Sequence, residues 1–244
     1  MNHEIKPLNV LVKGLLLFLL FNLVIAAWQP RVGQFSLYNI LYPGRERLPF
    51  GENPKQSYNL SLFNLDAMFA SHVIAGTPKA DDEFRVIVIG DSSVWGTLLK
   101  PEETLIGQLN EASLNACKKN VRAYNLGYPT ISLTKDVMML SYGMQYDPDL
   151  VIWMTTLDAF PNEKQTSTPL VANNEANVRG LATSYGLRVE ADDPNFEKKS
   201  FWEKTFVGDR RSWADIIRLQ IYGVMWSATG IDQFYPAEYE KAKT

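Results

Sequence analysis

Three short, largely apolar runs alternate with amphipathic stretches in the middle of the chain. The runs lie at 85–89, 121–125 and 150–154, and each ends at polar or turn-forming residues, a pattern typical of buried strands in a parallel sheet. Between them, apolar residues recur at helical spacing over 101–112 and 132–145. The order strand, helix, strand, helix, strand predicts an α/β fold, a flavodoxin-like three-layer α/β/α sandwich with a parallel sheet.

The most hydrophobic segment lies near the N-terminus, over residues 8–28. It carries no charge after Lys13, and its length approaches the roughly 20 residues that cross a bilayer. Trp28 suits one membrane–water interface, and the flexible Lys13 side chain can reach the other. We therefore expect an uncleaved transmembrane helix. A cleaved signal peptide is the alternative, because Lys6 and Lys13 precede the Leu- and Phe-rich core and residues 25–27 form a small-residue cleavage site.

The charges that flank this segment indicate its orientation. Lys6 and Lys13 favour an N-terminus on the cytoplasmic side, although Arg31, Arg45 and Arg47 follow the segment closely. Because a short basic tail before a first span usually stays inside, we expect a single-pass protein of the cell membrane. Its main domain is then extracytoplasmic, and the membrane lipid bilayer is one of its partners.

Composition shifts divide the rest of the chain. Several prolines after the anchor (1–28) predict an extended connector at 29–60 without a core of its own. The α/β core is expected over 61–160, beginning with a helical pattern at 62–75. The polar stretch 161–212 predicts an insertion or lid.

The last part of the chain, 213–244, begins with an amphipathic helix and continues as a tail. Three roles fit this helix: packing on the sheet, lying on the membrane, or preceding further sequence. Its apolar residues recur at helical spacing: Trp213, Ile216, Ile217, Ile221, Val224 and Met225.

The composition argues against several classes of function. The 244 residues carry a net charge of −3, which gives no electrostatic case for binding nucleic acid. The single cysteine, Cys117, cannot form a disulfide within the chain, and two histidines, His3 and His72, are too few for a histidine-based metal site. Since the sequence also lacks a CxxC pair, a Walker-type loop and a GxGxxG loop, we predict no cofactor and no metal.

The residues that follow the first strand carry the candidate chemistry. Gly90-Asp91-Ser92 comes directly after this strand, so Ser92 lies at the carboxyl edge of the predicted sheet, where open α/β sheets bind ligands. A serine hydroxyl at that edge is a candidate nucleophile. The alternative is structural, because Asp91 or Ser92 can cap the helix that follows.

Two further strand ends are expected at the same edge. The second strand is followed by Gly127, which is either a functional backbone donor or a turn glycine before Pro129. The third is followed by Asp158, for which the structural alternative is a loop or capping residue. The sequence therefore predicts that Ser92, Gly127 and Asp158 meet at one edge of the sheet.

These three strand ends resemble the SGNH (GDSL-like) hydrolase superfamily over about 84–160. Gly90-Asp91-Ser92 is similar to the first family block, Asn125-Leu126-Gly127 to the second, and Thr156-Leu157-Asp158 stands where the third block has Gly-x-Asn. The resemblance implies that Ser92 is the nucleophile. It also implies that the Ser92 N–H, the Gly127 N–H and the third-block side chain bind the oxyanion of the tetrahedral intermediate.

The chain departs from the family pattern at two places. Asp158 replaces the asparagine, and an ionised carboxylate cannot donate to an oxyanion; Asp158 is therefore protonated, has another role, or marks a site that stabilises no such intermediate. The family's base comes from a later Asp-x-x-His, whereas no histidine follows His72. We favour the interpretation that the chain is part of a longer protein, over an unusual complete fold that is not a standard hydrolase.

His72 offers a third explanation for the missing base. Some membrane-linked O-acetyltransferases that resemble this superfamily place an Asp and a His before the nucleophile, as Asp66 and His72 precede Ser92. A spacing of six residues puts Asp66 and His72 on different helix faces, which argues against a direct pair. The alternative for His72 is a residue at a helix end, hydrogen-bonded to the backbone or to solvent.

We therefore expect a membrane-anchored SGNH-like serine esterase or acyltransferase. Its substrate would be an ester of the cell envelope, carried by a lipid or a glycan. The alternative is a catalytically inactive SGNH-like scaffold that acts as an interaction subunit of a membrane assembly.

Overall fold

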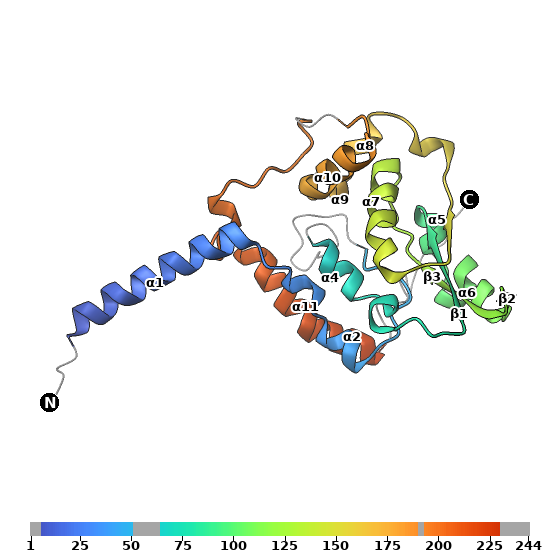
Figure 1. Cartoon of the computed structure of the whole chain (residues 1–244), viewed down its shortest axis with the longest axis horizontal. Coiled ribbons are helices and arrows are strands. Elements are labelled where there is room, and N and C mark those ends of the chain that lie inside the picture. The colour runs from blue at the N-terminus through green and yellow to red at the C-terminus, as the bar shows by residue number, and fades with distance from the viewer. Residues whose placement is uncertain (1–5, 51–63, 190–192, 230–244) are drawn as a thin grey trace, which may run out of the picture.

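The computed structural model describes residues 6–50, 64–189 and 193–229. It is a mixed α/β protein in which one long helix, α1 (Pro7–Trp28), projects from a body of four strands and shorter helices (Figure 1). Pro7 starts α1, since the missing N–H of a proline would be unpaired in the first turn anyway.

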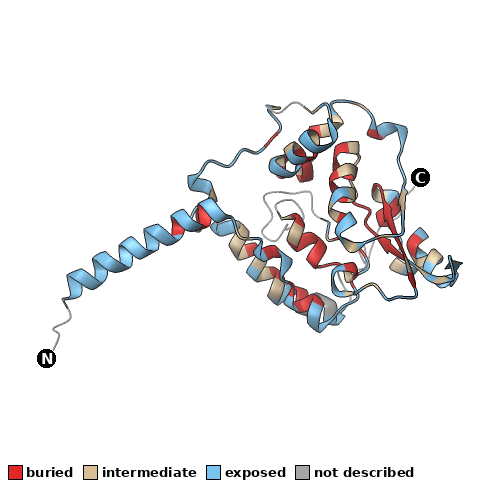
Figure 2. Ribbon diagram, viewed as in Figure 1, coloured by how far each residue is buried: buried red, intermediate tan, exposed pale blue. Residues whose placement is uncertain are grey.

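Nearly all of the α1 surface is exposed (Figure 2). Only Asn22, Ile25 and Ala26 are buried, at the end nearest the body. Within the described ranges, α1 is the single helix that is long and apolar enough to cross a membrane. The predicted apolar N-terminal helix is therefore confirmed as a structural element.

The chain after α1 is more structured than the predicted extended connector. It forms the short helices η1 (Val32–Gln34) and α2 (Leu37–Leu41), and α2 packs along α11 (Arg210–Thr229). Tyr38 and Leu48 are fully buried in two different apolar clusters. The prolines did not reveal this, because they restrict the backbone without determining which side chains are buried. The predicted connector residues 51–60 lie outside the described residues.

Four strands form one sheet in the order β2-β3-β1-β4. The central strand β1 (Glu83–Ile89) pairs in parallel with β3 (Lys119–Asn125) and with β4 (Leu150–Trp153), as the alternating pattern predicted. A short strand, β2 (Asn115–Ala116), pairs antiparallel with β3 and makes the sheet mixed rather than all-parallel.

Alternate residues of β1 enter two apolar clusters on opposite faces of the sheet, as strand geometry requires. Ile87 and Ile89 pack in the larger cluster, together with Met138 and Met139 of α7 (Leu133–Gly143). Val86 and Val88 pack in the smaller cluster beneath α6 (Leu105–Glu111). Helices thus cover both faces of β1, and the carboxyl ends of the strands are left at one edge.

The remaining elements are short. The predicted helix at 62–75 is two pieces in its described part, α4 and η2, which are separated at Ser71-His72, and Ser132 caps α7 by accepting from the Lys135 N–H. Their bounds are α4 Leu65–Ala70, η2 Val73–Gly76, α5 Ser92–Trp95, η3 Pro101–Glu103, η4 Met144–Tyr146, η5 Leu157–Ala159, α8 Lys164–Ser167, α9 Pro169–Ala172, α10 Glu175–Tyr185 and η6 Trp202–Lys204.

The polar stretch predicted as an insertion or lid contributes to the main apolar core. Leu170, Val171 and Val178, from α9 and α10, are completely buried in the larger cluster. The polar composition of this stretch conceals the few apolar residues that enter the core. We therefore describe α9 and α10 as a layer packed against α7.

Candidate active site

Ser92 lies at the start of α5, immediately beyond the end of β1. Asp91, not Ser92, caps this helix: its Oδ1 accepts from the Ser93 N–H at 2.9 Å and from the Ser93 hydroxyl at 2.8 Å. Ser92 is half-buried, and within the part of the chain that the structure describes its hydroxyl makes no hydrogen bond. The Ser92 hydroxyl is therefore free to react or to bind a ligand.

Two adjacent residues of the connector, Arg47 and Leu48, hold α5 in place. The indole N–H of Trp95 donates to the Leu48 carbonyl at 2.8 Å, and Arg47 Nη1 donates to the Gly96 carbonyl at 2.9 Å. Gly96 ends α5 with a φ of 85°, a left-handed conformation that favours glycine. These contacts fix the position of α5, and with it the position of Ser92, relative to the sheet.

Gly127 packs directly against α5. A Cβ at this position would lie 2.5 Å from the Trp95 backbone nitrogen, so only glycine fits without a shift. Its N–H donates to Asn125 Oδ1 at 3.0 Å, and Asn125 Nδ2 in turn donates to the Val94 carbonyl at 2.8 Å. The structure therefore brings Gly127 beside the helix of Ser92, but with its N–H already paired.

Gly90 allows the third strand end to approach. A Cβ there would lie 2.6 Å from a Val94 methyl and 2.7 Å from the Met154 carbonyl oxygen. The ends of β1, β3 and β4 consequently meet around Gly90 and α5, as the order of strands and helices predicted.

Asp158 lies in η5 and is directed to solvent. Its side chain is 60% exposed and forms an ion pair with Lys164, with 2.6 Å between Nζ and Oδ1. In this arrangement the Asp158 carboxylate is paired with a cation. Lys164, six residues later in the chain, was the sequence signal available for this pairing.

His72 is completely buried, and both of its ring nitrogens are used. Nδ1 accepts from the Ile74 N–H at 3.1 Å, which leaves the proton on Nε2, 2.9 Å from the Glu46 carbonyl oxygen. Burial lowers the pKa of the imidazole to about 4. His72 therefore matches the structural alternative, a residue hydrogen-bonded to the backbone at a helix start.

Asp66 does not pair with His72. Its carboxylate instead contacts the guanidinium of Arg31 and the hydroxyl of Tyr142. Burial and this carboxylate raise the pKa of the Tyr142 phenol. The Asp–His arrangement considered for the upstream residues is thus absent from the described geometry.

The sequence did not reveal a buried ion pair directly beneath the candidate site. Lys135 is fully buried, and its ammonium donates to the carbonyls of Gly90 (2.8 Å) and Tyr128 (3.2 Å) and pairs with Asp136 (2.5 Å). Burial lowers the pKa of Lys135. All three donors are used, so Lys135 links the ends of β1 and β3 rather than serving as a free base. The sequence signal for this buried pair was a lysine close to the methionines of the apolar face of α7.

The arrangement presents an unbonded serine hydroxyl beside a close-packed turn. Within residues 6–50, 64–189 and 193–229, no base hydrogen-bonds to the Ser92 hydroxyl and no group of three or more histidine, cysteine or acidic side chains is placed to hold a metal ion. Comparison with protein-family models, with curated proteins and with solved structures finds no match to this chain.

Proposed function

We propose that the protein is a membrane-anchored, SGNH-like serine esterase or acyltransferase of three-layer α/β/α architecture. The observation that carries the proposal is the Ser92 hydroxyl, half-buried and unbonded among the described residues, at the point where three strand ends meet. Its substrate class would be an ester of an envelope lipid or glycan, since α1 would hold the domain at a membrane.

In this mechanism the Ser92 oxygen attacks the carbonyl carbon of the ester while a base takes the hydroxyl proton, and the ester bond then breaks as the alcohol leaves with that proton. Water, or the hydroxyl of an acceptor, afterwards removes the acyl group from Ser92. The Ser92 N–H donates no hydrogen bond within the described part of the chain and is thus one available oxyanion donor. Gly127 can act as a second donor only if its N–H leaves Asn125 Oδ1. The base is the component still to be identified, because His72 and Lys135 are both fully engaged.

The second candidate function is an interaction subunit without catalysis, and the β4 edge favours it. β4 has no second strand partner among the described residues, although its sequence is a continuous apolar run of the kind found in central strands. Leu150 and Trp153 are exposed on it, and Leu157, just beyond, is 89% exposed. Such an edge is a site where a strand from another polypeptide can add.

A fluorophosphonate probe separates the two candidates, because it labels only activated serines. We expect the full chain in detergent to be labelled, Ser92→Ala to lose the label, and Ser93→Ala to keep it. Ser93 is a suitable control because it is adjacent and its hydroxyl is bonded to Asp91. A wild-type chain that takes no label contradicts the hydrolase and supports the interaction subunit.

The membrane placement is tested separately. We propose that α1 stays in the mature protein as a single-pass anchor. Carbonate extraction should then leave the protein in the membrane pellet, and its intact mass should include residues 1–28. A mature protein that begins near residue 28 and is released from membranes would instead establish the signal peptide.

A further inference from the structure

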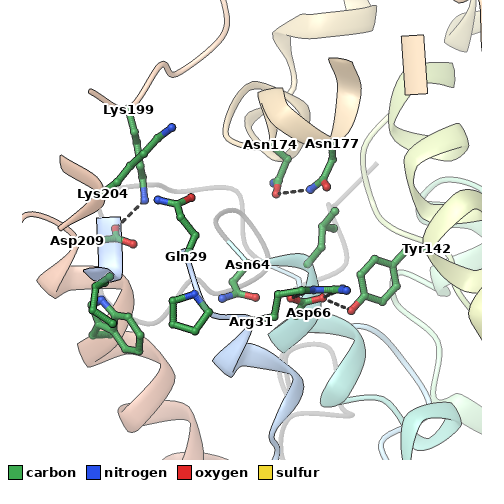
Figure 3. Close-up of a pocket in the computed structure, with 14 residues that line it drawn as sticks. Gln29, Arg31, Asn64, Asp66, Tyr142, Asn174, Asn177, Lys199, Lys204 and Asp209 are labelled. Carbon is green, nitrogen blue, oxygen red and sulfur yellow. Dashed lines mark hydrogen bonds and ion pairs between the residues drawn. The ribbon is translucent and has the colours of Figure 1, made fainter. Parts of the chain in front are cut away.

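A polar cavity of about 430 Å³ lies where α1 meets the body (Figure 3). Its lining comes from the end of α1, from α4, α7 and α10, and from the segment 199–213, which are far apart in the sequence. The volume falls within the roughly 300–1,000 Å³ typical of small-molecule sites. The cavity lies on other elements than Ser92, so it is distinct from the candidate active site.

Among the described residues, the charged side chains of the lining leave one positive charge without an ion-pair partner. Arg31 forms a bidentate ion pair with Asp66, and Lys199 Nζ lies 2.6 Å from Asp209 Oδ1. Lys204 is half-buried and forms no ion pair among the described residues. The cavity thus has three cationic and two anionic side chains, and its surplus charge is positive although the whole chain is negative.

Neutral hydrogen-bonding groups surround these charges. The side chains of Gln29, Asn64, Asn174 and Asn177 line the cavity. Asn174 and Asn177 point toward one another, 3.4 Å apart, and face the Arg31–Asp66 pair across the cavity (Figure 3). Amides of this kind donate to phosphate oxygens and both donate to and accept from hydroxyl groups.

An apolar surface adjoins the polar cavity on the side of α1. The segment 201–207 packs on α1, where the rings of Phe206 and Phe21 lie 5.4 Å apart and the Val207 N–H donates to Asn22 Oδ1 at 3.1 Å. Trp202 in this segment is 71% exposed. These contacts lie about 10 Å along α1 from Trp28, inside the apolar helix. The exposed ring of Trp202 and the packed ring of Phe206 thus provide apolar surface beside α1.

We propose that this cavity binds the phosphate-bearing head of a membrane lipid, with the acyl chains lying along α1 and the segment 201–207. The polar cavity for the head adjoins the apolar surface for the acyl chains, as binding of an amphiphile requires. Lys204 supplies the uncompensated charge for a phosphate, and the amides pair with the remaining polar atoms of the head. The inference rests on the proposed anchoring by α1 but not on the chemistry of Ser92.

Native mass spectrometry of the full chain in detergent tests this site with three probes. Phosphatidylglycerol is the phosphate lipid, diacylglycerol supplies the same chains without phosphate, and glycerophosphoglycerol is the head alone. We expect the wild type to retain phosphatidylglycerol far better than either of the other two. We expect Lys204→Gln to weaken that retention roughly tenfold, because a charge-assisted hydrogen bond to phosphate is lost.

Two matched variants control for net charge and for apolar surface. Lys198→Gln removes the same charge from an exposed position just before the segment 199–213 and outside the cavity, and should leave retention within about twofold of wild type. Trp202→Ser should weaken retention of the lipid without changing binding of the soluble head. Leu114→Ser, an exposed apolar residue on the β2 side of the molecule, should leave both unchanged.

The proposal is overturned if Lys204→Gln and Lys198→Gln behave alike, or if diacylglycerol is retained as well as the phospholipid. Equal affinity for the soluble head would assign the cavity to a free phosphate ester instead. A dimer in place of lipid adducts would assign the apolar surface to a second copy. If carbonate extraction releases the protein, α1 is not a membrane anchor and the proposed membrane placement is wrong. If the protein stays in the membrane but Lys204→Gln does not change lipid retention, only the proposed lipid site is wrong.

Discussion

Burial gives His72 a structural role and a measurable dependence on pH. The folded protein binds the imidazole proton with a pKa of about 4, whereas the unfolded chain binds it near 6.5. Between these values the unfolded state holds more protons, so stability is present above pH 6.5 and is lost as the pH falls toward 4. The cause is desolvation of a charge that the surrounding backbone groups cannot compensate.

His72→Asn should remove this pH dependence while its side-chain oxygen still accepts from the Ile74 N–H. Between pH 7.5 and 5.0 the wild type should lose roughly 2 kcal/mol more unfolding free energy than the variant. Urea denaturation at several pH values measures the difference. Parallel curves for the two proteins would show that His72 is solvated in the folded state.

Gly127 is a second residue whose role depends on its neighbours. Gly127→Ala should destabilise the protein by about 1–3 kcal/mol, because the new methyl collides with the α5 backbone. Gly180→Ala in α10 is the matched control: no atom lies within 4 Å of its Cβ position, so helix propensity predicts a gain of about 0.5–1 kcal/mol. In urea unfolding, the two variants should change the unfolding free energy in opposite directions. Equal changes would contradict the close approach of Gly127 to the α5 backbone.

At the scale of elements, the Lys135–Asp136 pair connects α7 to three strand ends. Lys135 reaches the ends of β1 and β3 through the Gly90 and Tyr128 carbonyls. Asp136 accepts from the indole N–H of Trp153, the last residue of β4, at 3.0 Å. Since these strand ends also carry the candidate site, the pair positions the turn on which Ser92 lies.

Lys135→Met should cost about 3–5 kcal/mol of unfolding free energy, because it leaves the Asp136 carboxylate buried and unpaired. The double variant Lys135→Met/Asp136→Asn should recover part of that loss. Lys164→Met removes an ion pair of more exposed side chains and should cost less than about 1 kcal/mol. Urea unfolding of all three gives the comparison; similar costs for the two single lysine variants would refute a structural role for Lys135.

At the scale of the whole molecule, a few specific contacts hold α1 against the body. Asn22, the polar residue within the apolar helix, accepts from Val207 and donates to the Phe18 carbonyl, so neither of its polar ends is left unpaired. The helix is thereby fixed to the segment 201–207 instead of rotating freely. The body should keep a defined orientation toward the membrane that α1 is proposed to cross.

Cys117 permits a direct test of the proposed sidedness. It is the single cysteine of the chain and is exposed at the β2–β3 turn. A membrane-impermeant maleimide applied to intact cells should label it if the body is extracytoplasmic, and Cys117→Ser should abolish the signal. Labelling that requires lysis would place the body in the cytoplasm.

The sequence by itself determined the main strands and the long N-terminal helix. The β1, β3 and β4 runs and the uncharged length of α1 are visible in the hydrophobic pattern, because that pattern records which positions leave water. It missed β2, since the turn at Cys117 and Lys118, with φ of 51° and 65°, lacks the Asn-Gly signal of such hairpins.

Only the tertiary structure decided what each buried group meets. Burial of His72, the three partners of Lys135 and the pairing of Asp158 with Lys164 depend on local geometry and on segments far apart in the chain. The cavity beside α1 likewise assembles from five regions of the sequence. Periodicity specifies that a face is buried but not against what, and desolvation and hydrogen bonding are set by those neighbours.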